Sequence, residues 1–316
     1  MMKRILYILL GVTLGLAQLA AQVSRNGNYH FRTEIGLAAK KYPEKTSWMV
    51  SVYNKAGARE YTIAKEVPYD VGFPAVYLAD DGACVVVSSF NGMVEFYASD
   101  GYVVGTLAPF PSPLPDYERT IYCSVADEQA AFAVSESHSS SARLLLTDLR
   151  GNRIWDRPLE GKSAGGVFLS DKGSYVLACS YSSDGGVRRS SVLLNATGEL
   201  LRMFNTLFRT ADISEESGHL VLADRNDVLI ASLEMSGAEA WWRTRKKENV
   251  VTAVKCSAGF VAAVVESVSV ESGAPIYHNP NIVVLNGRGE VLLTRSLHGS
   301  SGQPSSIEMD AEALRL

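Results

Sequence analysis

The sequence predicts an all-β protein of the β-propeller class, with six four-stranded sheets around a central axis. Three observations support this prediction: a strand motif that recurs about every 46 residues, a glycine turn that recurs in phase with it, and the lack of sustained helical periodicity after residue 21. The composition is that of a globular domain, because 47% of the 316 residues are hydrophobic and 20% are charged.

The first repeated marker is a short apolar strand that ends in a small residue, in most copies followed by an acidic turn. Its copies are Val76–Asp80, Cys123–Asp127, Val167–Asp171, Ala211–Glu215, Val254–Ser257 and Ile307–Asp310. The second marker is a glycine turn after a later strand. It occurs at Gly57, Gly101, Gly151, Gly198, Gly237 and Gly289. The two markers are independent and share one period, which indicates an internal repeat.

Each repeat has room for four strands. In residues 164–204 we expect strands at Gly165–Ser170, Ser174–Tyr181, Ser191–Asn195 and Glu199–Phe204, with a polar loop over Ser182–Arg189. These segments are rich in Val, Ile, Leu and Tyr and are bounded by Gly, Asp and Ser. Four strands in 40 to 50 residues is the size of one propeller blade.

The two ends of the chain complement each other. The N-terminal repeat has strands at Trp48–Asn54 and Arg59–Ile63, and residues 28–39 supply one more, but the first strand is missing upstream. The C-terminus holds such a strand at Ser305–Asp310. We therefore expect six blades in a ring closed by pairing of the C-terminal and N-terminal strands, which removes exposed sheet edges. Seven blades is the alternative.

The first 21 residues have the form of a secretory signal peptide. Met1–Arg4 carry positive charge, Ile5–Leu19 are almost all apolar, and small residues place the cleavage after Ala21. About 15 apolar residues are few for a membrane span, which takes roughly 20; an uncleaved anchor is the alternative. We therefore expect residues 22–316 to form a single propeller domain in the periplasm or outside the cell.

Charge and motifs exclude several functional classes. The formal net charge of −4, with no basic run longer than Arg245–Lys247, argues against nucleic-acid binding. The sequence has no P-loop, no Gly-x-Ser-x-Gly elbow and no His-Glu-x-x-His motif. The five histidines lack metal-ligand spacing, so we expect neither a metal nor a cofactor. They are His30, His138, His219, His278 and His298.

The four cysteines fall inside predicted strands, where cysteine commonly serves as a small apolar filler. They are Cys84, Cys123, Cys179 and Cys256. We expect free buried thiols. Because secretion would place the chain in an oxidising compartment, a Cys84–Cys123 disulfide between successive repeats is the pairing to test.

The fourth strands show a family resemblance. Leu146–Trp155, which reads Leu-Thr-Asp-Leu-Arg-Gly-Asn-Arg-Ile-Trp, resembles the repeat of quinoprotein-type (PQQ-like) propellers. Leu233–Trp242 is similar, whereas Leu194–Leu201 and Leu285–Leu292 keep the turn but replace the tryptophan. Secreted WD40-like propellers are equally similar in the spacing of their repeats. The resemblance covers residues 28–316. It implies a cofactor-free propeller whose blades contact proteins, since the vicinal cysteine pair of many quinoprotein dehydrogenases is absent.

One column of residues lies where the first strand of each blade would line the axis. It contains Tyr77, Ser124, Phe168, Asp212, Lys255 and Glu308. The last three come from successive repeats, so we expect Asp212, Lys255 and Glu308 to be neighbours. They would form either a polar axial pocket or, as we prefer, an ion pair between blades that fixes their packing.

The loops between second and third strands would share one face with the connections between blades. The long loops are Ser135–Arg143, Tyr181–Arg189 and Glu266–Asn281. They give a candidate binding face of aromatic residues, arginines and their neighbours, and Arg and Tyr are among the residue types that dominate protein interfaces. Its members are His138, Tyr181, Arg188, Arg189, Arg209, Tyr277, His278 and Asn279. The adjacent arginines Arg188 and Arg189 would also suit an acidic glycan or a phosphate.

These observations favour a secreted or periplasmic, non-catalytic propeller that binds a protein partner or another ligand, for example in cell-envelope assembly. The alternative is an enzyme, either a hydrolase, a lyase or a small quinoprotein, that uses the central channel. The axial Asp212, Lys255 and Glu308 motivate that alternative.

Overall fold

The computed structural model describes most of the chain. The described residues are 23–36, 45–68, 73–88, 91–110, 119–137, 140–182, 188–234, 239–244, 246–257, 259–271 and 274–296. Within these ranges the chain forms 23 β-strands. Among these described residues, no helix is long and apolar enough to cross a membrane. The proposed signal peptide and the strand expected at Ser305–Asp310 lie outside these ranges.

The strands form six antiparallel sheets, which we call blades 1 to 6 in chain order. Blade 1 has the order β1 (Tyr29–Ile35), β2 (Lys45–Asn54), β3 (Arg59–Pro68). Blade 2 comprises β4 (Ala75–Leu78), β5 (Cys84–Ser88), β6 (Met93–Tyr97) and β7 (Val103–Leu107). Blade 3 comprises β8 (Arg119–Val125), β9 (Gln129–Glu136), β10 (Arg143–Asp148) and β11 (Arg153–Pro158).

The remaining blades follow the same plan. Blade 4 comprises β12 (Ser163–Leu169), β13 (Tyr175–Ser182), β14 (Arg188–Asn195) and β15 (Leu200–Phe204). Blade 5 comprises β16 (Thr210–Ser214), β17 (His219–Asp224), β18 (Asp227–Ser232) and β19 (Ala240–Arg243). Blade 6 comprises β20 (Asn249–Ser257), β21 (Phe260–Glu271), β22 (Ala274–Asn286) and β23 (Val291–Ser296).

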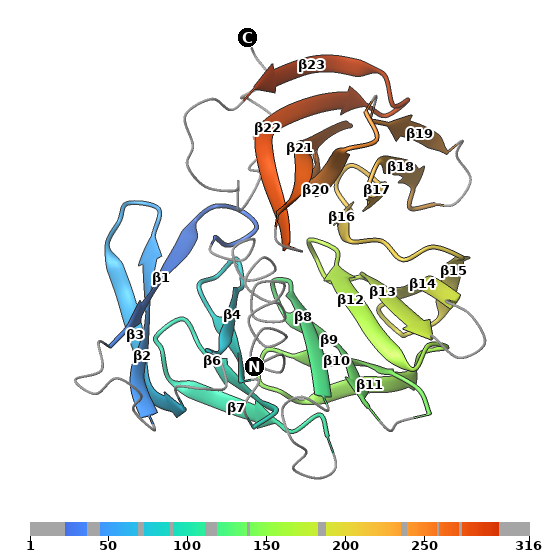
Figure 1. Ribbon diagram of the computed structural model, residues 1–316. Helices are drawn as coiled ribbons and strands as arrows, with labels where there is room; N and C mark the ends of the chain where they lie inside the picture. The colour runs from blue at the N-terminus through green and yellow to red at the C-terminus, as the bar shows by residue number, and fades with distance from the viewer. Residues whose placement is uncertain are drawn as a thin grey trace.

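Figure 1 shows the six blades around a common centre, with β4, β8 and β12 toward it and β7, β11 and β15 at the periphery. The all-β propeller with six sheets is therefore confirmed, and a seventh sheet is not found among the described residues. The expectation of four strands in every sheet holds for five of them. Blade 1 has three described strands, and the segment expected to complete it, Ser305–Asp310, lies outside the described ranges.

The predicted strands of blade 4 agree with the observed ones to within three residues. The expected loop Ser182–Arg189 was too long, since Arg188 and Arg189 belong to β14 and pair with Ser182 and Tyr181 of β13. The loop expected at Glu266–Asn281 was wrong, because β21 and β22 continue through most of it as a hairpin. The alternation of valine with serine over residues 267–270 is the period of a strand.

The core consists of apolar layers between neighbouring blades. Leu144 and Leu146 of blade 3 pack with Val176 of blade 4, and Leu177 on the opposite face of that sheet packs with Ile213 of blade 5. An inner strand is thus buried on both faces. This explains why β5, for example, is a continuous run of buried residues rather than an alternating pattern.

The four cysteines are buried in these layers as free thiols, so the Cys84–Cys123 disulfide is not formed. Burial raises the pKa of Cys84 to about 12 and that of Cys179 to about 11. Thiols held in the protonated form in this way are unreactive and serve as packing residues.

The repeated turn between third and fourth strands connects neighbouring blades. In blade 3, the Asp148 carboxylate accepts hydrogen bonds from the backbone N–H groups of Arg150 (2.9 Å) and Asn152 (2.8 Å). Trp155 then donates its indole N–H to the carbonyl of Ala196 in blade 4, at 2.8 Å. The aspartate, glycine and tryptophan of this repeat therefore shape the turn and join it to the next blade.

Gly151 of this turn meets two requirements. Its φ is +80°, and a Cβ at this position would lie 2.9 Å from the ring of Phe96 in blade 2. Gly57, the equivalent residue of blade 1, has the same φ, but a Cβ there would have no atom within 4 Å. A comparison of the two positions therefore distinguishes the cost of backbone strain, which both share, from the cost of close packing between blades, which only Gly151 has.

We predict that Gly151→Ala destabilises the protein more than Gly57→Ala. The Gly57 variant should cost about 1–2 kcal/mol for a non-glycine residue in the left-handed region. The Gly151 variant should cost roughly 1–3 kcal/mol more, because the methyl group would displace Phe96. Urea unfolding of both variants measures the difference, and equal losses would contradict a packing role for this turn.

Candidate functional site

A short N-terminal segment, residues 23–28, links first strands of three blades. The backbone N–H of Asn26 donates to the carboxylate of Asp80 in blade 2 at 2.8 Å. The guanidinium of Arg25 donates to the carbonyls of Leu169 in blade 4 (2.9 Å) and Ile213 in blade 5 (3.2 Å). The sequence analysis missed this role, since an isolated arginine carries no signal of a partner 187 residues away.

Asp212 of β16 is the centre of a buried ion cluster. Its side chain is 7% exposed, and it accepts a hydrogen bond from the Arg25 guanidinium. The Lys255 amine lies 3.7 Å from the same carboxylate oxygen, and the backbone N–H of Cys256 donates to the other oxygen at 2.8 Å. Asp212 and Lys255 are therefore adjacent, as expected from the repeat, whereas Glu308 lies outside the described residues.

The cluster has the geometry of a connection between blades 5 and 6. Both oxygens of Asp212 already accept a hydrogen bond. Burial lowers the pKa of Lys255 below its usual value, and the neighbouring Asp212 only partly opposes this shift. Another residue of the column acts in the same way, because the Ser124 hydroxyl accepts the N–H of Leu169 in the next blade at 3.0 Å. Among the described residues, no three potential metal ligands lie together.

The acidic residue of the repeated strand motif also joins blades. The Asp171 carboxylate accepts the N–H of Glu215 in the next blade at 3.0 Å. In return, the Glu215 carboxylate accepts hydrogen bonds from the Ser170 hydroxyl (2.5 Å) and the Ser174 N–H (3.0 Å). Burial favours a higher pKa for Glu215, but these hydrogen bonds outweigh it and lower the pKa. The carboxylate thus stays charged, and the motif fixes the alignment of blades 4 and 5.

We predict that Asp212→Ala lowers the free energy of unfolding by about 3–5 kcal/mol, because Arg25 and Lys255 would lose their shared buried partner. The matched control is Asp224→Ala in the same blade, whose partner Arg209 lies 3.7 Å away and is half exposed. That change should cost less than about 1 kcal/mol. Chemical unfolding of both variants is the measurement, and a comparable loss in the two would rule out a central role for the cluster.

The residues of the candidate binding face fall into two groups. Tyr181, Arg188 and Arg189 lie at the β13–β14 turn of blade 4, with Arg209 on the connection to blade 5. In blade 6, the residues Tyr277, His278 and Asn279 lie within strand β22 rather than in a loop. His138 is outside the described residues. Blade 5 separates the two groups along the ring, so they offer two distinct surfaces.

A polar pocket of about 520 Å³ lies beside the first group. It is lined by Glu160, Gly161, Ser180, Ser182, Arg188 and Ser190. Its volume is in the range of small-molecule sites. The sequence analysis named only Arg188 of these residues, because the others meet through strand register and through the connection between blades 3 and 4.

Strand register decides which of the two adjacent arginines reaches the pocket. Ser182 pairs with Arg188 and Ser180 pairs with Ser190, so these side chains share one face of the sheet. Tyr181 pairs with Arg189, which places both on the other face. The Arg188–Arg189 dipeptide is therefore divided between two surfaces, with Arg188 toward the pocket.

Comparison with known proteins identifies the fold. No protein-family model and no curated protein sequence matches the chain. Among solved structures, Sqt1 from Chaetomium thermophilum is similar, with a TM-score of 0.53, 10% identity, and coverage of 87% of this chain and 70% of that one.

A second similar structure is the β-propeller domain of Cps50 (Swd1) from Myceliophteria thermophila. It has a TM-score of 0.50 and 12% identity, and the match covers 84% of this chain and 90% of that domain. The chain therefore has the β-propeller fold. At these identities the likeness shows the fold alone, and the function of this propeller has to come from its own sites.

Proposed function

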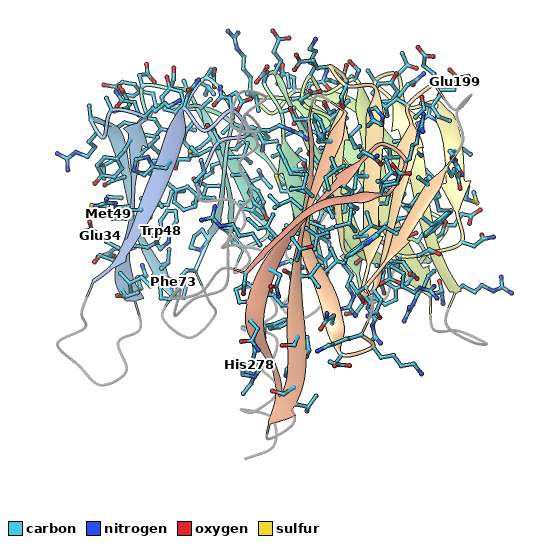
Figure 2. All side chains as sticks on the ribbon, turned by 90° about the horizontal axis from the view of Figure 1, so that it is seen from above. Glu34, Trp48, Met49, Phe73, Glu199 and His278 are labelled. Carbon is cyan, nitrogen blue, oxygen red and sulfur yellow. The ribbon has the colours of Figure 1, made fainter. Side chains whose placement is uncertain are left out.

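We propose that the protein is a non-catalytic propeller scaffold that acts outside the cytoplasmic membrane and binds a protein partner through the β21–β22 hairpin. The observation that supports this proposal is the length of that hairpin. β21 and β22 have 12 and 13 residues, whereas the next longest strands have 10. Figure 2 shows the hairpin extending, at His278, well beyond the other strands of the ring.

The outer part of the hairpin has no neighbouring strand among the described residues. Pairing of β20 with β21 ends at Asn249 and Ser267, and pairing of β23 with β22 ends at Asn281 and Ser296. Isolated two-stranded hairpins are marginally stable in water. A partner surface that covered this one would therefore stabilise it.

One face of the outer hairpin is apolar. Val268 is opposite Tyr277, and Val270 is opposite Pro275, so the four side chains share that face. Val270 is 71% exposed. The opposite face is more polar, since it carries Ser267, Ser269 and His278 beside one apolar residue, Ile276, and the Ser269 hydroxyl lies 2.8 Å from the imidazole Nε2 of His278. An exposed apolar face beside a polar one is typical of a docking surface for an apolar patch on another protein.

Side chains rather than strand addition would provide recognition along β22. Pro275 and Pro280 have no backbone N–H, and prolines at a sheet edge oppose the pairing of a further strand. We therefore infer that the partner supplies an apolar patch that contacts Val270 and Tyr277. The enzyme alternative is less well supported, because the axial Asp212 and Lys255 are paired with each other and with Arg25.

The proposed location depends on the first 21 residues. Their basic, apolar and small-residue regions support export and cleavage after Ala21. The mature chain would then begin at Gln22, three residues before Arg25. Arg25 would thus remain available to bind Asp212 after cleavage.

We predict that Val270→Asp abolishes capture of the partner. The mature chain, residues 22–316, is mixed with an extract of the cell envelope, cross-linked, and analysed by mass spectrometry. A charge on the apolar face would oppose its burial. Because the position is exposed, the stability of the protein should change by less than about 0.5 kcal/mol.

The matched control is Ser269→Asp, which adds the same charge to the adjacent residue on the polar face. This variant should capture the partner as the unmodified chain does. The proposal fails if Val270→Asp and Ser269→Asp capture the same proteins in equal amounts, or if the unmodified chain captures none reproducibly.

We also infer that the ring is closed by Ser305–Asp310, which would add to the edge of β1 opposite β2, beyond the single bridge between Val23 and His30. Every other blade has one strand more than blade 1, and the missing strand is the first one. Ile307–Asp310 matches the motif of that strand. A strand at this position would cover the part of the β1 edge that no other described strand pairs with.

Truncation tests this closure. A chain that ends at residue 304 should lose several kcal/mol of stability and should aggregate, since the apolar Ile307 and Met309 would each contribute about 1.5–3 kcal/mol when buried. A chain that ends at residue 312 is the control and should unfold as the full-length protein does. Equal stability of the two truncated chains in urea would refute the closure.

A further inference from the structure

We propose that the pocket between blades 3 and 4 is a binding site for a small acidic saccharide, that is, a sugar that carries a carboxylate, sulfate or phosphate group. This site is independent of the β21–β22 hairpin and of any protein partner. It lies where the apolar layer between the two blades ends and serine side chains replace the leucines and alanines.

The pocket wall is held in place by backbone contacts. The N–H of Gly161 donates to the Ser180 hydroxyl oxygen at 3.3 Å, and the N–H of Lys162 donates to that of Ser182 at 3.1 Å. A Cβ on Gly161 would lie 2.5 Å from the backbone nitrogen of Tyr181, so this close approach requires glycine. The connection between blades 3 and 4 thus sits directly on the end of β13.

The pocket is rich in hydrogen-bond donors. Ser180 and Ser182 each accept a backbone hydrogen bond, and neither hydroxyl donates one to another described residue, so both can donate to a ligand. The hydroxyl oxygen of Ser190 is buried and has no hydrogen-bond partner among the described residues. Unpartnered buried hydroxyls are rare in folded proteins and indicate a position that a ligand or a water molecule occupies.

Arg188 supplies the positive charge. It is exposed at the pocket rim, and no carboxylate among the described residues forms an ion pair with it. A guanidinium group and several hydroxyl donors on one side form a good site for an oxyanion, which accepts hydrogen bonds at each of its oxygens.

The remaining features favour a sugar rather than a simple ion. A volume of about 520 Å³ exceeds the size of a single phosphate or sulfate and leaves room for a pyranose ring. Glu160 at the rim can accept hydrogen bonds from sugar hydroxyl groups. A donor-rich floor with one carboxylate at its edge thus matches an acidic group attached to a polyhydroxyl ring.

The test compares sugars that differ only in their charged group. Isothermal titration of the mature chain with glucose 6-phosphate, glucose 6-sulfate, glucuronic acid and glucose should show binding of at least one acidic sugar, at least tenfold tighter than that of glucose. The affinity should fall as the salt concentration rises, because part of the attraction is between charges near the surface.

Arg188→Gln should weaken the binding of that acidic sugar at least tenfold. Arg189→Gln is the matched control, since it removes the same charge from the adjacent residue on the other face of the sheet. The affinity of this variant for the acidic sugar should stay within twofold of that of the unmodified chain. Ser190→Ala should weaken binding several-fold through the loss of one hydrogen bond, and Val270→Asp in the hairpin should have no effect.

Three results would overturn the proposal. They are the failure of all three acidic sugars to bind, equal affinity for glucose, and equal losses in Arg188→Gln and Arg189→Gln. Circular dichroism and thermal unfolding of each variant show whether a loss of binding comes from the altered site or from unfolding. Because Val270→Asp leaves this pocket intact, the experiments can confirm or refute the saccharide site independently of the proposed protein-docking hairpin.

Discussion

The structure depends on the packing of each blade against its two neighbours, which buries both faces of its inner strands. A single twisted sheet of four short strands cannot bury its own apolar residues, so the blades are stable only as a packed set. Residues such as Leu177 and Leu144 form these layers. Features that recur in the sequence contribute to the contacts between blades, as Asp171, Gly151 and Trp155 show.

This constraint determines where function can reside. Around the axis, Asp212, Lys255 and Ser124 are used to connect blades, and Arg25 brings the N-terminal segment into the same network. Side chains that bind other molecules must then lie at the ends of the strands, away from the packed layers. The β21–β22 hairpin and the pocket at the end of β13 are both located there.

The two proposed surfaces differ in chemistry because they differ in their relation to the packed layers. The hairpin extends beyond the layers, so its apolar residues, including Val270 and Tyr277, pack against no other blade among the described residues. The pocket lies at the margin of a layer, where Gly161 and the serines bring polar groups into a space enclosed by two blades. One surface suits an apolar patch on a protein, and the other suits a small polar ligand.

The sequence by itself determined the fold class, the number of sheets and most strand positions. The reason is that the repeat encodes each blade locally through short apolar strands, glycine turns and acidic turns. It also determined that Asp212 and Lys255 are neighbours, because they occupy equivalent positions in successive repeats. The tertiary structure alone decided which of Arg188 and Arg189 faces the pocket, since strand register sets that choice. It also decided that Arg25 contacts Asp212, because that contact joins segments far apart in the chain that no local pattern records.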